Sequence, residues 1–268
     1  MRCLRAALVL AAAAPAACDR NASPSAGAGD GSPRRVLFVT WDTTRADHVG
    51  AYGGAARTPR FDELAKRGVL YEHAEACAPI TLPSHASMLT GVLPREHGAR
   101  DNAIFQLAGA ARLLPEALKE QGFKTGAFVA AYVLDPKFGL AQGFDVYDAP
   151  DASAASQSWS VVERPAGAVA DAAIRWIDAL RPDDRFFLWV HFYDPHEPLA
   201  PADEHARAGV SPYDLEIERC DRELGRLLDH LRGRGLDRGL ITAVTADHGE
   251  SLGEHGERTH GVFLYEST

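Results

Sequence analysis

Acidic and imidazole side chains stand directly after two of the most apolar segments of the chain. Asp42 follows residues 35–41, and Asp247 and His248 follow residues 240–246. Both segments are typical of strands buried on both faces, and ligands gather where such strands end. Two strand-end carboxylates repel each other unless a cation lies between them. The pattern predicts a divalent metal held by Asp42, Asp247 and His248, against the alternative that each aspartate only caps a helix.

Apolar runs and helical patterns alternate along the chain. The apolar runs predict buried strands at residues 35–41, 125–131, 186–192 and 240–246. The helical patterns lie at residues 61–67, 111–121, 166–180 and 213–232. This alternation predicts an α/β fold, with a mainly parallel, doubly wound sheet and helices on both of its faces. Neither an internal repeat nor the boundary of a second domain is evident.

The N-terminus has the features of an export signal. The apolar run at residues 6–14 has the length of a signal core and is too short to span a bilayer. Small residues and Cys18 follow, in an arrangement that resembles a bacterial lipoprotein signal with Pro15 at the usual leucine position. We expect residues 1–18 to direct export, with either lipidation of Cys18 or simple secretion. The protein would then be periplasmic or a cell-envelope lipoprotein.

The remaining composition bounds the domain organisation and the partners. Residues 19–34 are rich in Gly, Ser, Ala and Pro and are expected to form a flexible linker before one folded domain at residues 35–268. The formal net charge of −9 argues against a nucleic-acid partner, because phosphate backbones call for a basic surface. If Cys18 carries lipid, the remaining pair, Cys77 and Cys220, forms either one disulfide or two buried thiols.

Three longer motifs resemble those of one enzyme family and occur in the same order. Val36–Gly53 resembles the opening strand and first metal-ligand turn of sulfatases, Thr81–Gly91 the nucleophile segment, and Thr245–Gly256 the second metal-ligand loop. Over residues 35–268 the chain is therefore similar to the sulfatase family of the alkaline-phosphatase superfamily. The resemblance implies an alkaline-phosphatase-like fold. Complete family members continue further, so it also implies a catalytic domain that is incomplete at its C-terminus.

The nucleophile segment departs from the sulfatase pattern. Sulfatases use a formylglycine made from the first residue of Cys/Ser-x-Pro-x-Arg, whereas the alignment places Thr81 there and His85 at the arginine position. The resemblance to threonine phosphodiesterases of the superfamily implies that Thr81 is a metal ligand and the nucleophile, since metal coordination can activate a hydroxyl. A helix beginning near Pro83 would add its positive end. Cys77 half-matches the modification pattern but lacks the arginine and is out of register.

The resemblance also implies contacts with the substrate. Asn102 is similar to an asparagine that holds a nonbridging oxygen of the transferred group, although a turn asparagine is the simpler reading. His196 corresponds to a histidine beside the leaving-group oxygen. His260 stands near a lysine that grips sulfate in sulfatases. The lysine segment that sulfatases place after an earlier strand is absent. Lys137 is either its substitute or an ordinary solvated loop lysine, so sulfate specificity stays open.

The number of metal ions also stays open. Two-metal members of the superfamily hold a second ion with an aspartate and two histidines, for which Asp194, His196 and His260 are the candidates. The spacing around Asp194 and His196 is tighter than that pattern, so one ion is expected, either Ca, Mn or Zn.

The expected activity is metal-dependent cleavage of a sulfate, phosphate or phosphonate ester through a threonine nucleophile. The substrate would be a small anionic ester or a sulfated or phosphorylated glycan. Contact with a membrane is expected only through a lipid anchor at Cys18. Two alternatives remain, a transferase of a phosphoglycerol-type head group and a non-catalytic glycan binder.

Overall fold

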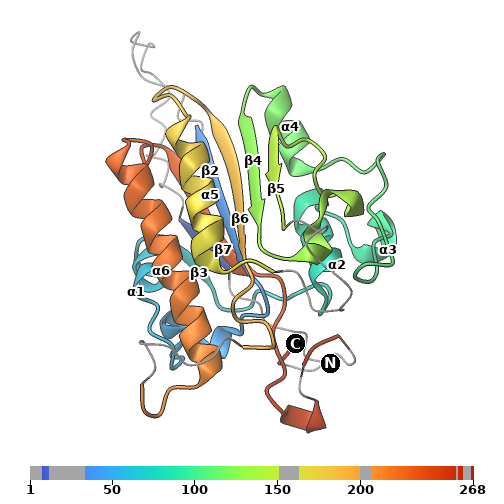
Figure 1. The fold of residues 1–268 in the computed structure, drawn as a ribbon, viewed down its shortest axis with the longest axis vertical. Coiled ribbons are helices and arrows are strands. Elements are labelled where there is room, and N and C mark those ends of the chain that lie inside the picture. The colour runs from blue at the N-terminus through green and yellow to red at the C-terminus, as the bar shows by residue number, and fades with distance from the viewer. Residues whose placement is uncertain (1–7, 12–33, 151–162, 200–206, 258, 262–266) are drawn as a thin grey trace, which may run out of the picture.

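A seven-stranded sheet forms the centre of the molecule (Figure 1). The computed structural model describes residues 8–11, 34–150, 163–199, 207–257, 259–261 and 267–268. The sheet has the order β3-β1-β7-β2-β6-β4-β5. The strands are β1 (Leu8–Ala11), β2 (Arg35–Trp41), β3 (Val69–Tyr71), β4 (Lys124–Val129), β5 (Val146–Asp148), β6 (Phe186–Phe192) and β7 (Leu240–Ala246).

Strand direction agrees with the predicted fold class. The pairings from β7 through β2, β6 and β4 to β5 are all parallel. Only β1 runs antiparallel to its neighbours, which are β3 and β7. The predicted α/β fold with a mainly parallel sheet is confirmed.

The helices lie outside the sheet (Figure 1). α5 and α6 lie side by side across one face of the sheet, whereas α2, α3 and α4 gather toward β4 and β5. The α-helices are α1 (Pro59–Arg67), α2 (Thr81–Thr90), α3 (Pro94–His97), α4 (Leu114–Glu120), α5 (Ala166–Asp178) and α6 (Pro212–Gly233). Short 3₁₀ turns occur at Ala46–His48, Gly50–Tyr52, Tyr132–Leu134, Pro136–Phe138 and Glu254–Gly256.

The central strands are apolar because both of their faces are covered. Every residue of β6 is buried, and Trp41 and Trp189 are among the largest fully buried side chains. Burying such side chains stabilises the fold by roughly 25 cal/mol for each Å² of apolar surface removed from water. This core makes the carboxyl ends of β2, β6 and β7 a rigid platform.

The predicted segments and the observed elements differ mainly at helix ends. β2, β6 and β7 have the predicted bounds, whereas β4 ends at Val129, two residues earlier than expected. α4 begins at Leu114, because the Glu116 side chain accepts the Leu113 N–H at 2.8 Å and caps the helix there. Caps depend on side-chain orientation, so hydrophobic periodicity places a helix better than it places its ends.

The N-terminal predictions stay untested, since most of the residues involved lie outside the described ranges. Leu8–Ala11, inside the expected signal core, forms β1. Cys18 and residues 19–33 fall outside the described residues.

Cys77 and Cys220 are both free thiols, but only Cys220 is buried, so the expectation of two buried thiols is wrong for Cys77. Among the described residues, no helix has the length and apolarity needed to cross a bilayer.

Candidate active site

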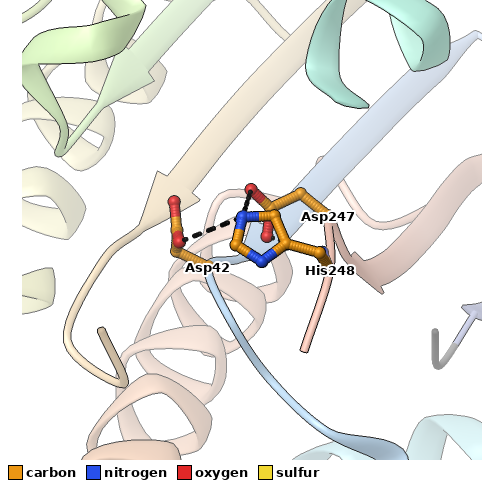
Figure 2. A group of neighbouring side chains, drawn as sticks. All are labelled: Asp42, Asp247 and His248. Carbon is orange, nitrogen blue, oxygen red and sulfur yellow. Dashed lines mark hydrogen bonds and ion pairs between the residues drawn. The ribbon is translucent and has the colours of Figure 1, made fainter. Parts of the chain in front are cut away.

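The predicted metal ligands meet at the carboxyl ends of two adjacent strands. β2 and β7 pair in parallel with Trp41 opposite Ala246, so Asp42 and Asp247 leave the sheet at the same level. Figure 2 shows their carboxylates and the His248 ring pointing toward one another. One ligand atom from each of Asp42, Asp247 and His248 lies within 4.8 Å of the others, and all three residues are buried.

Each aspartate has one carboxylate oxygen without a hydrogen-bond partner, and His248 turns an unprotonated ring nitrogen toward them. The Asp247 Oδ1 atom accepts the N–H groups of Thr43 at 3.1 Å and His248 at 2.9 Å, whereas its Oδ2 atom has no hydrogen-bond partner. The Oδ1 atom of Asp42 is likewise unpaired. His248 Nδ1 lies 2.9 Å from the Gly249 carbonyl, which can only accept. Nδ1 therefore carries the proton, and the lone pair of Nε2 faces the carboxylates.

The electrostatics of the cluster call for a cation. Burial, followed by repulsion from Asp247 and Glu250, raises the pKa of Asp42 well above its usual range. Burial also raises the pKa of Asp247 and lowers the pKa of His248 well below its usual range. Two buried carboxylates with unpaired oxygens beside a bare imidazole nitrogen cost free energy unless a positive charge lies among them. The residues present therefore fit a divalent metal ion.

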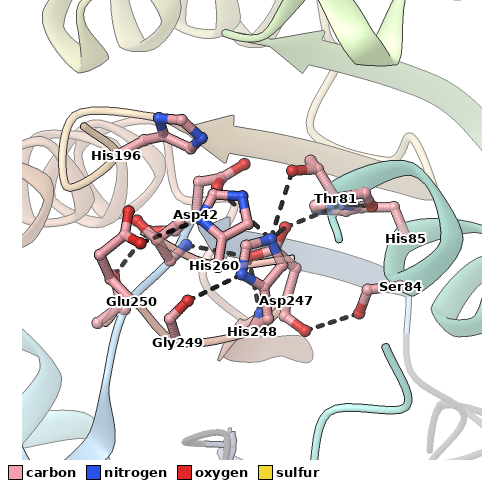
Figure 3. Close-up of polar contacts among 12 residues, drawn as sticks. Asp42, Thr81, Ser84, His85, His196, Asp247, His248, Gly249, Glu250 and His260 are labelled. Carbon is pink, nitrogen blue, oxygen red and sulfur yellow. Dashed lines mark hydrogen bonds and ion pairs between the residues drawn. The ribbon is translucent and has the colours of Figure 1, made fainter. Parts of the chain in front are cut away.

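Thr81 joins this cluster as the first residue of α2. Its Oγ1 atom lies 3.4 Å from His248 Nε2, and the side chain is 1% exposed (Figure 3). The Ser84 hydroxyl donates to the Asp247 carbonyl at 2.7 Å and ties the first turn of α2 to the loop after β7. The positive dipole end of the helix favours an anion at this place.

His191 of β6 makes a buried hydrogen bond to Asp42. The Ala130 N–H donates to His191 Nδ1 at 3.3 Å, so the ring proton of the neutral imidazole is on Nε2, which lies 3.0 Å from Asp42 Oδ2. Burial and the nearby histidines lower the pKa of His191 well below its usual range, in keeping with the neutral ring. The sequence analysis did not select this residue. The available signal was a single polar side chain inside the otherwise apolar run of β6.

Asn102 lies beside the first turn of α2, which begins at Thr81. Its Oδ1 atom accepts the Leu82 N–H at 2.8 Å, next to Thr81. This bond holds the amide against the first turn of α2, and the two N–H donors of Nδ2 remain for a ligand. The observed contact shows that Asn102 fastens this turn, and its predicted contact with the substrate stays a prediction.

Three histidine rings form a row away from Thr81. The centroid of His260 lies 4.4 Å from that of His248 and 4.9 Å from that of His196. His260 Nδ1 bonds to the Oε1 atom of buried Glu250 at 3.1 Å, while Oε2 of Glu250 has no partner. Glu250 was not selected from the sequence. Its place in the loop that carries Asp247 and His248 was the available signal.

His196 stacks on Tyr193, with centroids 4.3 Å apart, and its Nδ1 donates to the Glu197 carbonyl. Burial, with a smaller contribution from His260, lowers the pKa of His196 to about 4. The ring is therefore neutral at pH 7 and presents a bare Nε2. Before it can donate to a leaving group, an anion must bind beside it and raise its pKa.

Two residues weighed from the sequence have other tasks in the structure. The Asp194 Oδ2 atom accepts the Ala166 N–H at 2.8 Å and caps α5, and burial raises the pKa of Asp194 to about 7. Lys137 places its ammonium 4.0 Å from the centre of the Tyr132 ring. Among the described residues, only Asp42, Asp247 and His248 form a cluster with metal-ligand geometry.

The backbone beside the site is strained. Thr43 has φ 51°, a left-handed conformation that β-branched residues rarely adopt. This conformation turns the Thr43 N–H toward Asp247 Oδ1, while Tyr213 donates its hydroxyl to the Thr43 carbonyl. The strain therefore helps to orient a candidate ligand.

Known proteins with similar sequences contain both sulfate-ester and phosphate-ester enzymes. An ulvan-active sulfatase of Formosa agariphila is 24% identical over 266 residues, covering 83% of this chain and 52% of that protein. The human ectonucleotide pyrophosphatase/phosphodiesterase family member 1 is 26% identical over 255 residues, covering 88% of this chain and 25% of that protein. This chain thus spans about half, or less, of the length of these relatives.

The fold comparison and the family comparison agree. The phosphonate monoester hydrolase of Agrobacterium radiobacter has a similar fold, with a TM-score of 0.67 and 19% identity, covering 87% of this chain and 66% of that structure. The family model described as Sulfatase matches residues 34–265. This range contains the strand ends, Thr81 and the clustered Asp42, Asp247 and His248, and the chain belongs to the sulfatase family.

Proposed function

We propose that the protein is a metal-dependent hydrolase that cleaves a sulfate or phosphate-type ester through Thr81. The observation that carries this proposal is the position of the Thr81 hydroxyl. It lies at the N-terminus of α2, 3.4 Å from His248 Nε2 and beside two buried carboxylates with unpaired oxygens. A threonine at the surface, or one that only caps a helix, would not need buried carboxylates and an imidazole nitrogen beside its hydroxyl.

Asp42, Asp247, His248 and Thr81 would hold one divalent cation. Calcium takes oxygen ligands, whereas zinc and manganese accept imidazole nitrogen beside carboxylates. The ligand set therefore favours zinc or manganese over calcium. When bound, the ion would lower the pKa of the Thr81 hydroxyl and offset the charge of an anionic ester.

The residues around the cluster have separate roles in this proposal. The Thr81 oxygen attacks sulfur or phosphorus, the bond to the leaving alcohol breaks, and water then releases the group from the threonine ester. The Nδ2 donors of Asn102 stabilise the equatorial oxygens, and the positive dipole end of α2 favours their negative charge. His196, protonated once the anionic ester lies beside it, returns a proton to the leaving oxygen.

The substrate class and the cellular location are part of the same proposal. Relatives named for ulvan and for N-acetylglucosamine 6-O-sulfate support a sulfated glycan, whereas the phosphodiesterase relative supports a phosphate diester. Thr81 stands where sulfatases have a residue that can become formylglycine. This departure supports a phosphate-type ester as a second candidate substrate. We propose export through residues 1–18, a linker at 19–34, and a catalytic domain starting at residue 35.

Parallel turnover assays test the function. The full-length protein would be given an aryl sulfate, a phosphate monoester, a phosphate diester and a phosphonate monoester, with and without chelator and with added Zn²⁺, Mn²⁺ or Ca²⁺. We expect chelator-sensitive turnover of at least one ester and a loss of at least about 10³-fold in Thr81→Ala. Thr90→Ala, at the other end of the same helix, is the matched control. Undiminished turnover in Thr81→Ala would contradict the proposal.

A further inference from the structure

We propose that His85 is a positioning residue that holds the nucleophile turn through a hydrogen-bond chain running from Trp189 through Thr40 to Thr81. The inference rests on the proposed function, because it assigns His85 an effect on the reactivity of Thr81. His85 occupies the place where the sulfatase pattern has an arginine, yet its contacts define a different task.

The donors and acceptors fix the direction of the chain. The Trp189 indole N–H can only donate, and it lies 3.1 Å from Thr40 Oγ1. At the other end the Thr81 carbonyl can only accept, and it lies 2.8 Å from His85 Nδ1. Nδ1 therefore carries the ring proton. In a neutral ring Nε2 is bare, and it accepts the Thr40 hydroxyl at 3.0 Å.

The surroundings hold the ring in one orientation. His85, Thr40 and Trp189 are all 0% exposed. The imidazole packs against Trp189 at 5.3 Å and against His191 at 5.0 Å between ring centroids. A buried donor and acceptor that are each paired define one orientation, and losing either partner leaves the other unsatisfied.

The chain connects the nucleophile to the strands that carry the other candidate ligands. Thr40 lies on β2 two residues before Asp42, and Trp189 lies on the neighbouring strand β6. The same Nδ1 atom of His85 lies 3.6 Å from the unpaired Oδ2 of Asp247. His85 thus fixes the first turn of α2 relative to Asp42 and Asp247, although it does not touch the Thr81 hydroxyl in the described contacts.

Position-specific replacements separate this role from simple core packing. Asn places an amide N–H near the position of Nδ1, whereas Gln places it near Nε2. We expect His85→Ala to lower kcat by about 10²-fold, because a displacement of about 1 Å can cost that much, with KM changed less than about threefold. His85→Asn should recover at least about tenfold of this loss through the restored donor, and His85→Gln should not.

The anchor of the chain gives a second matched pair. Thr40→Val keeps the shape of the side chain but loses the hydroxyl, and we expect kcat to fall about tenfold. Thr40→Ser keeps the hydroxyl and should retain kcat. His97 is the control, because it is a buried histidine of α3 that bonds to Ser87 of α2, at 2.9 Å, without reaching Thr81. His97→Ala should lower the melting temperature and leave kcat of the folded protein unchanged.

Two readouts keep the inference distinct from the proposed function. If wild-type protein turns over an ester and His85→Ala keeps its kcat, the positioning role is wrong while the function stands. Recovery by His85→Gln that equals recovery by His85→Asn would also overturn it. The ¹⁵N imidazole spectrum of the full chain, assigned with His85→Asn, tests the chain without any turnover. We expect a ring proton on Nδ1, and a ring protonated at Nε2 alone would overturn the inference.

Discussion

The two sides of the candidate site are built differently. On one side, Asp42, Asp247 and Thr81 are fully buried and stand on β2, β7 and α2, where strand register sets their positions. On the other side, His196 and His260 are held by loops, through the Glu197 carbonyl and the Glu250 carboxylate. In the proposed function the strand and helix side would activate the nucleophile, and the loop side would contact the leaving alcohol.

Removing a carboxylate from the strand and helix side should have the largest effect. Asp42→Asn keeps a partner for His191 but removes the charge that holds a cation, so we expect activity to fall by at least about 10³-fold. The metal-free variant should nevertheless melt at a higher temperature than metal-free wild type, because its repulsion from Asp247 and Glu250 is gone. Thermal melts with and without metal would show this crossover. A variant less stable than wild type in both conditions would contradict the cation site.

The support behind Asp42 should matter next. His191→Phe fills the buried space but removes the Nε2–H donor to Asp42 Oδ2, and we expect metal affinity to fall by about 10- to 100-fold. Competition with a fluorescent chelator measures this directly. His191→Gln, which can restore a donor at the Nε2 position, is the matched variant. Equal affinities for wild type and His191→Phe would show that the pair is only structural.

The loop side should respond to the leaving group. His196→Asn should slow esters of poorly acidic alcohols by about 10²-fold and leave nitrophenyl esters nearly unchanged, since only poor leaving groups need a proton. A plot of log kcat against the pKa of the alcohol measures this. A slope equal to that of wild type would remove His196 from the reaction.

His196 also makes a pH-dependent contribution to stability. Its pKa is lowered from 6.5 to about 4 in the folded state, so the unfolded chain binds more protons between these values. The stability linked to the neutral ring is therefore present above pH 6.5 and lost as the pH falls toward 4. His196→Asn should flatten the fall in melting temperature over this window. An unchanged fall would place the ring in a more solvated setting.

The strained turn should show the smallest effect. Thr43→Gly relieves the positive φ but loses a buried side chain, whereas Thr44→Gly loses a buried side chain and its hydrogen bond to the Asp42 carbonyl with no strain to relieve. We therefore expect Thr43→Gly to be more stable than Thr44→Gly by about 1–2 kcal/mol in chemical unfolding. Equal free energies of unfolding would mean that the turn stores no strain.

The same contrast explains what could be predicted from the sequence. Asp42, Asp247 and His248 follow apolar runs whose length and composition mark buried strands, so their meeting was predictable. His191, Glu250 and the Thr40–His85 bond depend on parallel register and on ring orientation. Hydrophobic periodicity does not encode either. The capping role of Asp194 depends on where α5 begins in space, which a single sequence does not reveal.

The central claim is that Thr81 forms a covalent ester during turnover. The most direct test quenches the full-length, metal-loaded protein in acid during turnover of its preferred ester and measures the mass of the peptide that contains Thr81. We expect an added sulfate or phosphate-type group on Thr81, absent after chelation and absent in Thr81→Ala. An adduct on another residue, or none on Thr81 under conditions in which a bound group would be trapped, would contradict the account.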